Sequence, residues 1–398
     1  MSLQFITGNS GNGKTKYLFN RIVKEAKANP RDNYLVIVPE QFTMQTQRQL
    51  VDLSENKAIM NIDVLSFKRL AYRVFDELGI TNLTVLEETG KNLVLRKLAA
   101  QEADKLGVIG RNLNSIGYIS EVKSLLSELV QYNISPEELG RYIASGMLSD
   151  TLSDKLKDVL VLYEAFEKFM QDKYITAEEI LNVLSNVAEE SAILRNSVIA
   201  FDEFTGFTPI QNQLIKKLFV ISKKIYVTLT IDCREDIFKS RGMQELFDMP
   251  KRTVKSLTEM AAFYGIEVEE PIILDKNYRL AENEELSFME QQLFRKRRCS
   301  FKKAPKHIHI DCLRDPKQEL TKIARRINEL VRNENLRYRD IAIVTGDVNI
   351  YAGYVREIFD KYNIPYFIDA TQEILFHPFI EFIRSIPVSY THLRAHET

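Results

Sequence analysis

The sequence predicts an α/β protein built on a parallel β-sheet, which a helical insert interrupts and the start of a second α/β domain follows. A short apolar run at residues 3–7 leads into a glycine-rich loop, and apolar residues then recur at helical spacing over 14–28. A β-branched run at 34–38 completes a strand–helix–strand unit, which is the signature of a parallel sheet. From about residue 85 to 196 the pattern changes to long amphipathic segments typical of helices.

Strand patterns return after this helical segment, at residues 197–201 and 224–230. Both segments are near-continuous apolar runs, as buried parallel strands tend to be. We therefore expect one sheet assembled from residues 1–84 and 197–300, with the helical insert between its two parts.

A second α/β section is predicted over residues 301–386 and is expected to be truncated. Apolar runs at 307–312, 341–345 and 366–369 are expected to be strands, and amphipathic segments alternate with them. The helices predicted here cover 316–331, 351–362 and 378–386. Residues 387–398 continue no periodic pattern, and we interpret them as sequence foreign to the protein.

The composition is typical of a soluble protein of two or three domains. The chain has 398 residues, too many for one ordinary core, and 27% of them are charged. Because no apolar run is long enough to cross a membrane and no secretory signal pattern is present, we expect a cytoplasmic protein without membrane contact. The net charge of −1 excludes a polycation, so any nucleic-acid binding must come from local basic surface.

The glycine-rich loop Gly8-Asn-Ser-Gly-Asn-Gly-Lys-Thr15 matches the phosphate-binding pattern G-x-x-x-x-G-K-[ST] at each fixed position. Its backbone amides and the helix that follows are suited to phosphate oxygens, Lys14 supplies a positive charge, and Thr15 offers a hydroxyl to Mg²⁺. The alternative is a glycine-rich turn, but the position between a strand and a helix favours a site for ATP or a close relative. The residues predicted to bind the nucleotide are Gly8, Asn9, Ser10, Gly11, Asn12, Gly13, Lys14 and Thr15.

An acidic pair follows the strand predicted at 197–201. Asp202 is expected to hold Mg²⁺, and Glu203 to orient or deprotonate the water that attacks the phosphate. Lys14 and Glu203 are the predicted catalytic residues. The alternative is a solvated acidic pair at a strand end. A phosphate-binding pattern on the same sheet favours the functional interpretation over this alternative.

The segment Phe201-Asp-Glu-Phe-Thr-Gly-Phe-Thr-Pro-Ile-Gln211 resembles the D-E-x-Q-D-T-N-x-x-Q motif of superfamily 1 helicases of the UvrD/RecB kind. The resemblance implies a RecA-like P-loop NTPase fold of that type. Thr205 and Gly206 stand where those helicases carry Gln and Asp, and one of those side chains couples the γ-phosphate to DNA movement. This departure favours, as an alternative, a scaffold that binds nucleotide and scans DNA without hydrolysis.

Further motifs make the sequence similar to the B-subunit family of the AddAB (RexAB) ATP-dependent helicase–deoxyribonucleases. They are Ile6-Thr-Gly8, Ile37-Val-Pro-Glu-Gln41, Val64-Leu-Ser-Phe-Lys-Arg-Leu-Ala71 and Asn363-Ile-Pro-Tyr-Phe-Ile-Asp369 with His377-Pro378. The resemblance implies a heterodimer, completed by an A-type partner chain, that processes DNA double-strand breaks for homologous recombination. It also implies binding of single-stranded DNA and duplex ends. An unrelated P-loop kinase or ATPase is the other alternative.

The B subunits of this family carry a C-terminal nuclease domain whose iron–sulfur cluster four cysteines hold. Three scattered cysteines, Cys233, Cys299 and Cys312, supply neither that set nor a C-x-x-C pair. We therefore expect the chain to be an N-terminal fragment. The iron–sulfur cluster is expected only in the missing C-terminal domain.

The resemblance also assigns roles to residues outside the phosphate loop. Asn277-Tyr-Arg279 is similar to an N-Y-R-S motif whose arginine reaches the γ-phosphate, which makes Arg279 a candidate phosphate ligand. Cationic and aromatic residues at helical spacing suit single-stranded DNA, although an ordinary amphipathic helix is the alternative. The predicted DNA-binding residues are Gln41, Phe67, Lys68, Arg69 and Arg73. The basic run 295–298 is either a phosphate track or a solvated linker.

Overall fold

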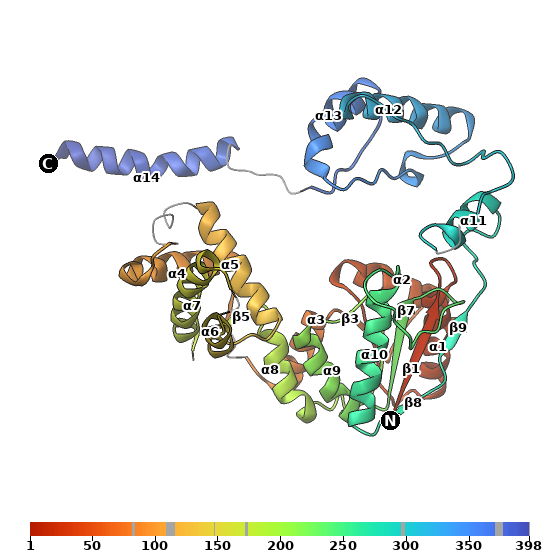
Figure 1. Ribbon diagram of the computed structural model, residues 1–398, viewed down its shortest axis with the longest axis horizontal. Helices are drawn as coiled ribbons and strands as arrows, with labels where there is room; N and C mark the ends of the chain where they lie inside the picture. Colours follow the sequence, from red (N-terminus) through yellow and green to blue (C-terminus); the bar gives the residue numbers. More distant parts are fainter. Residues whose placement is uncertain are drawn as a thin grey trace. The chain divides into compact units, whose positions relative to one another are not determined.

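Figure 1 shows the computed structural model of the chain. The chain divides into two compact units, Met1–Lys303 and Ala304–Thr398, which we describe separately. The structure describes residues 1–81, 84–108, 116–146, 148–171, 174–295, 299–370 and 377–397. No helix in these described ranges is both long enough and apolar enough to cross a membrane.

A seven-stranded sheet forms the centre of the first unit, and every pairing in its described strands is parallel. The order is β3-β2-β6-β7-β1, and β8 and β9 both pair with β1 at the edge. The strands are β1 (Ser2–Gly8), β2 (Tyr34–Ile37), β3 (Ile62–Leu65), β6 (Val198–Phe201), β7 (Lys224–Thr230), β8 (Glu267–Val268) and β9 (Ile272–Leu274). Four of them confirm predicted strands, and β3, β8 and β9 were not predicted.

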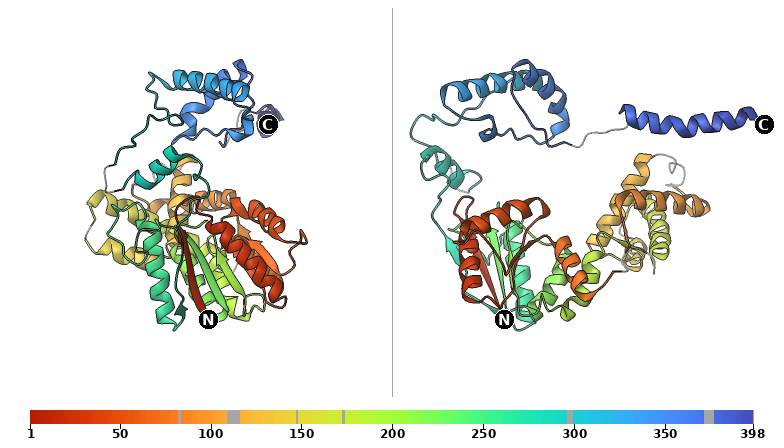
Figure 2. Two further views of the ribbon diagram at one scale, coloured as in Figure 1. Left: turned by 90° about the vertical axis from the view of Figure 1, so that its right-hand side faces the viewer. Right: turned by 180° about the vertical axis from the view of Figure 1, so that it is seen from behind.

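Helices cover both faces of this sheet, so the first unit has three layers (Figures 1 and 2). One face packs against α1 (Lys14–Ala28) and α2 (Thr43–Leu53), through a core that contains Leu18, Ile22 and Leu50. The other face packs against α3 (Phe67–Leu78), α8 (Ile180–Val187), α9 (Pro209–Ile221) and α10 (Asp248–Phe263). Helix α1 has the predicted bounds.

The helical insert has a separate hydrophobic core between α4 and α7. It contains α4 (Glu88–Gln101), α5 (Ile116–Gln131), α6 (Pro136–Ala144) and α7 (Asp150–Met170), and β4 (Val85–Leu86) pairs with β5 (Ile175–Thr176). The predicted insert covers residues 85–196, and not all of its helices pack in this separate core. Ile180 and Leu184 of α8 lie in the core of the sheet instead. Helical spacing does not reveal which core an apolar face joins, because long-range packing decides that.

The second unit contains the predicted helices but not the predicted strands. Its helices are α12 (Pro316–Asn333), α13 (Val348–Lys361) and α14 (Pro378–Glu397), and α14 runs through residues that we interpreted as foreign sequence. The predicted strands at 307–312, 341–345 and 366–369 are wrong, since no described residue there forms a strand. A parallel strand requires a neighbour for its backbone hydrogen bonds.

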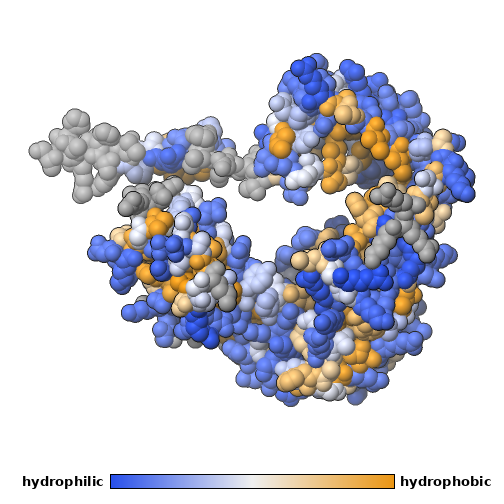
Figure 3. All heavy atoms as spheres, in the orientation of Figure 1, coloured by the Kyte–Doolittle hydropathy of each residue, from blue (hydrophilic) through white to orange (hydrophobic). Residues whose placement is uncertain are grey.

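Without such neighbours, the apolar residues of the three segments stay partly uncovered. Ile310, Val344 and Phe367 are 94%, 93% and 88% exposed. Apolar surface is visible on this unit in Figure 3. The remaining short elements in the described ranges are η1 (Glu40–Phe42), η2 (Ala103–Lys105), η4 (Ala188–Glu190), α11 (Glu284–Gln292) and η5 (Tyr338–Asp340).

Candidate functional site

The glycine-rich loop connects β1 to α1 and has the close backbone approach that its glycines allow. Gly11 and Gly13 have φ angles of 88° and 79°, in the left-handed region that favours glycine. A Cβ atom on Gly11 would lie 2.8 Å from Cβ of Arg279 and 2.9 Å from Oδ1 of Asn277. The loop therefore has no room for a side chain at Gly11.

Lys14 folds back over this loop. Its Nζ donates hydrogen bonds to the carbonyl oxygens of Gly8 at 3.1 Å and Asn9 at 3.0 Å. Burial lowers the pKa of Lys14, and the negative charge of Glu203 acts in the opposite direction. A phosphate group that replaced the two carbonyl partners would stabilise the ammonium form.

The predicted acidic pair follows β6 and faces the loop. Asp202 is buried, the Thr228 hydroxyl donates a hydrogen bond to its Oδ1, and its Oδ2 is buried without a hydrogen bond in the described part of the chain. Burial raises the pKa of Asp202, against the effect of the Thr228 hydrogen bond. The hydroxyl of Thr15 donates to Oε1 of Glu203 at 3.3 Å. A buried carboxylate oxygen beside a hydroxyl suits the oxygen ligands that Mg²⁺ prefers.

Glu203 has a backbone conformation that non-glycine residues seldom adopt. Its φ angle is 63°, in the left-handed region, and such conformations persist only where the surrounding structure holds them. The turn directs its exposed side chain toward Thr15 rather than away from the loop.

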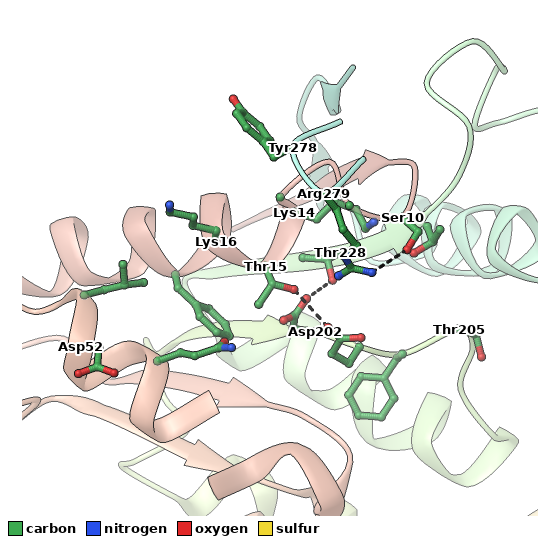
Figure 4. A pocket seen from close by; sticks show the side chains of 18 residues that line it. Ser10, Lys14, Thr15, Lys16, Asp52, Asp202, Thr205, Thr228, Tyr278 and Arg279 are labelled. Carbon is green, nitrogen blue, oxygen red and sulfur yellow. Dashed lines mark hydrogen bonds between the residues drawn. The ribbon is translucent and has the colours of Figure 1, made fainter. Parts of the chain in front are cut away.

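One cavity of about 730 Å³ brings these residues together (Figure 4). This volume lies within the range of roughly 300–1,000 Å³ that is usual for small-molecule sites. Because β7 alone separates β1 from β6, the carboxyl ends of the strand before the glycine-rich loop and of the strand before the acidic pair reach the same edge of the sheet. The predicted residues that line the cavity are Ser10, Gly11, Gly13, Lys14, Thr15, Asp202, Glu203 and Arg279.

Two of the predicted nucleotide-binding residues have side chains that brace the loop instead of facing the cavity. Asn9 donates to Oε1 of Glu290 at 2.8 Å and accepts from the backbone N–H of Cys233 at 2.9 Å. Asn12 donates to the carbonyl oxygen of Leu274 at 2.6 Å. Both side chains are buried, so the prediction that these two residues bind nucleotide rests on their backbone amides.

The segment that contains Arg279 lies directly on the loop. The backbone N–H of Tyr278 donates to the carbonyl oxygen of Gly11 at 3.0 Å, and Nη1 of Arg279 lies 3.4 Å from Oγ of Ser10. Tyr278 also lines the cavity and is 64% exposed, yet it was not predicted as a site residue. Its position in the same short motif as Arg279 was the available signal.

An ion-pair network around a buried aspartate lies next to the residue that holds Asn9. Asp232, which is 1% exposed, accepts hydrogen bonds from Arg234 at 2.9 and 2.6 Å and from Arg295 at 3.0 Å. Burial opposes ionisation of Asp232, but its bonds and charge interactions with the two arginines outweigh burial and lower its pKa from 3.8 to about 2. Asp232 is next to Cys233, whose N–H holds Asn9.

We expect Asp232→Asn to lower the free energy of unfolding by about 2 kcal/mol at pH 7, because hydrogen bonds to charged groups contribute roughly 1.5–3 kcal/mol. Since the pKa of Asp232 is lowered, this stability is present above pH 3.8 and is lost as the pH falls toward about 2. Thermal unfolding at pH 7 and at low pH measures the difference. The exposed Asp76→Asn is the control, and a loss for Asp232→Asn equal at both pH values would contradict the expectation.

The candidate DNA surface lies on the first turns of α3. Lys68, Arg69 and Arg73 are exposed, but Nε of Arg69 lies 2.9 Å from Oε1 of Glu40 and Nε of Arg73 lies 3.9 Å from Oδ2 of Asp63. Within the described residues, no carboxylate forms an ion pair with Lys68. Among these three basic residues, Lys68 is therefore the one whose charge is most available to a phosphate group.

The other two predicted DNA-binding residues have different environments. Gln41 is exposed in η1, beside a shallow hollow that includes Glu40, Lys68 and Tyr72. Phe67 is 7% exposed, so the prediction that its ring binds DNA is wrong: the ring is in the core. The amphipathic pattern placed Phe67 near the basic residues but did not show which way its ring points. Of the basic run 295–298, residues 296–298 lie outside the described residues, and Arg295 pairs with Asp232.

Together, the fold and the site define an α/β protein whose glycine-rich loop and acidic pair border one cavity at the carboxyl edge of a parallel sheet. A family model described as "ADDB, N-terminal" matches residues 5–290. The chain therefore belongs to the family of AddB N-terminal regions, which confirms the resemblance that the motifs indicated.

Three similar proteins share the same name. The chain is 38% identical over 397 residues to the B subunit of the "ATP-dependent helicase/deoxyribonuclease" of Lachnoclostridium phytofermentans, an alignment that covers 98% of this chain and 34% of the relative. Proteins of the same name from Clostridium tetani and Clostridioides difficile are each 33% identical, over 97% of this chain and 34% of each relative. The chain thus spans about a third of the length of these curated relatives.

Proposed function

We propose that the chain is the ATP-binding part of the B component of a heterodimer, which works with an A component as a cytoplasmic helicase–nuclease that processes DNA double-strand breaks for homologous recombination. One observation carries the nucleotide part of this proposal. Lys14, Thr15, Asp202 and Glu203 come from segments almost 200 residues apart and line the same cavity. The names of the relatives support the helicase–nuclease part, and the shared family supports the transfer to this chain.

Each residue has a distinct part in the proposed site. The loop amides and Lys14 would bind the phosphates, Arg279 would reach the γ-phosphate from its position beside Ser10, and Thr15 and Asp202 would hold Mg²⁺. When bound, Mg²⁺ neutralises phosphate charge and polarises the bond that breaks. Glu203 holds the attacking water and accepts its proton.

The proposal is tested by single-turnover ATP hydrolysis with and without single-stranded DNA. We expect hydrolysis by the wild type, and a loss on the order of 100-fold or more in Glu203→Gln with ATP affinity retained, because a positioned general base contributes roughly 10²–10⁴-fold. Glu190→Gln, an exposed glutamate in η4, is the control. Equal rates for wild type and Glu203→Gln would exclude Glu203 as the base.

A non-hydrolysing scaffold that scans DNA is the second candidate function. Thr205 and Gly206 favour it, because glycine has no side chain and the hydroxyl of threonine is shorter than the Gln side chain of related helicases. In that case the same assay gives tight Mg²⁺-dependent ATP binding, sensitive to Lys14→Ala, but no product in one turnover. The two functions are therefore separated by one measurement.

DNA binding by the exposed face of α3 is a further part of the proposal. We expect Lys68→Ala to weaken binding of single-stranded oligonucleotides of every sequence, and to reduce the slope of log affinity against log salt by about 1, as loss of one phosphate contact does. Fluorescence anisotropy over a salt series measures the slope. Lys24→Ala, an exposed lysine of α1, is the matched control, and an unchanged slope in Lys68→Ala would remove α3 from the DNA surface.

A further inference from the structure

Four phenylalanines form a closed aromatic cluster between the acidic pair and α3. Phe67 begins α3, Phe201 ends β6, and Phe204 and Phe207 lie in the loop between Asp202 and α9. Each ring contacts the other three, with ring centroids 5.2–6.3 Å apart. Their angles range from near-stacked to edge-on, arrangements that stabilise aromatic pairs beyond burial alone.

The cluster includes residues on both sides of the backbone that orients Glu203. Phe201 and Phe204 flank the acidic pair in sequence, and their rings lie 6.2 Å apart, so both sides of the left-handed turn at Glu203 are anchored in the cluster. Such a turn in a non-glycine residue is strained and persists only where its surroundings fix it. The cluster therefore supplies the packing that keeps the Glu203 carboxylate beside Thr15.

The same cluster reaches the candidate DNA surface through Phe67. The Ser66 side chain caps the first turn of α3 and also donates to Glu40, which pairs with Arg69. Phe67 lies between this cap and Lys68, so a ligand that displaces the first turn also displaces the Phe67 ring. Because the rings are closely packed, a shift of Phe67 also shifts the three rings that it contacts, which are those of Phe201, Phe204 and Phe207.

We propose that Phe204 and Phe207 are positioning residues that hold Glu203 and couple the nucleotide site to the α3 surface. The inference rests on the proposed function, since it requires nucleotide in the cavity and DNA on α3. It assigns a coupling route to a chain in which Thr205 and Gly206 replace the polar residues of related helicases. Binding of one ligand then changes the affinity for the other, and the change is reciprocal.

The test compares affinities for a slowly hydrolysed ATP analogue with Mg²⁺, measured with and without saturating oligothymidylate on the full chain. We expect the two affinities of the wild type to differ on the order of tenfold, within the usual range for coupled sites. In Phe204→Leu and Phe207→Leu, the ratio of the analogue affinity with oligothymidylate to the affinity without it should approach one. The DNA affinity measured without nucleotide should change less than about threefold. Phe204→Tyr keeps a ring and should restore the ratio.

Phe219→Leu is the matched control, because Phe219 lies in the same core but outside the four-ring cluster. It should lose thermal stability like the cluster variants and keep the wild-type ratio. Two results would overturn the inference but leave the proposed function standing. One is that Phe204→Leu and Phe207→Leu keep the wild-type ratio, and the other is that a wild type that binds both ligands has a ratio of one. Failure of the wild type to bind nucleotide would instead overturn the proposed function, and the inference with it.

Discussion

Lys14→Ala weakens ATP binding on the order of 100-fold, as expected when a half-buried charge that bonds a phosphate is removed. The chain stays folded, because within the described residues Lys14 bonds only two loop carbonyl oxygens. Calorimetric titration with MgATP and a thermal melt measure the two effects. Lys16→Ala is the control, since Lys16 lines the same cavity but is exposed, and its expected loss is below about threefold. Wild-type affinity in Lys14→Ala would refute the phosphate loop as a nucleotide site.

The pH dependence of the same titration follows from the lowered pKa of Lys14. Burial disfavours its ammonium form, whereas the phosphates require that form. ATP affinity should therefore fall as the pH rises through a pKa below the ordinary lysine value of 10.5. This alkaline loss should be absent in Lys14→Arg, because a guanidinium stays charged throughout the range.

Asp202→Asn should affect binding and stability in opposite directions. Burial raises the pKa of Asp202, so its ionised form destabilises the fold at neutral pH, and this penalty is relieved as the pH falls through the raised value. Asparagine is neutral and its amide oxygen still accepts from Thr228. We expect the melting temperature at pH 7 to rise on the order of 2 °C, whereas Mg²⁺-dependent enhancement of ATP binding is lost.

Asp232→Asn provides the control of opposite sign. Both aspartates are 1% exposed, but the pKa of Asp232 is lowered and that of Asp202 is raised. The same substitution should thus destabilise one site and stabilise the other. A melting temperature lowered in Asp202→Asn would contradict the expected cost of burying this carboxylate. An unchanged response of ATP binding to Mg²⁺ would contradict the proposed metal role.

The local sequence determined the elements that build the site. The strand, glycine-rich loop and helix over residues 2–28 follow from short-range constraints: apolar spacing, glycines where a left-handed backbone is needed, and a lysine at the start of the helix. The acidic pair was predicted in the same way from a buried run that ends in Asp202 and Glu203. These features depend on neighbours within a few residues, which the sequence displays directly.

Only the tertiary structure decided which side chains meet. The pattern of α3 did not show that Phe67 packs against Phe201, and that of the loop did not show that Asn9 and Asn12 turn away from the cavity. The predicted strands after residue 304 failed for a related reason, because a strand needs a partner that its own apolar pattern cannot supply. Contacts between residues far apart in the chain depend on how whole elements pack, and periodicity within one element does not encode its partner.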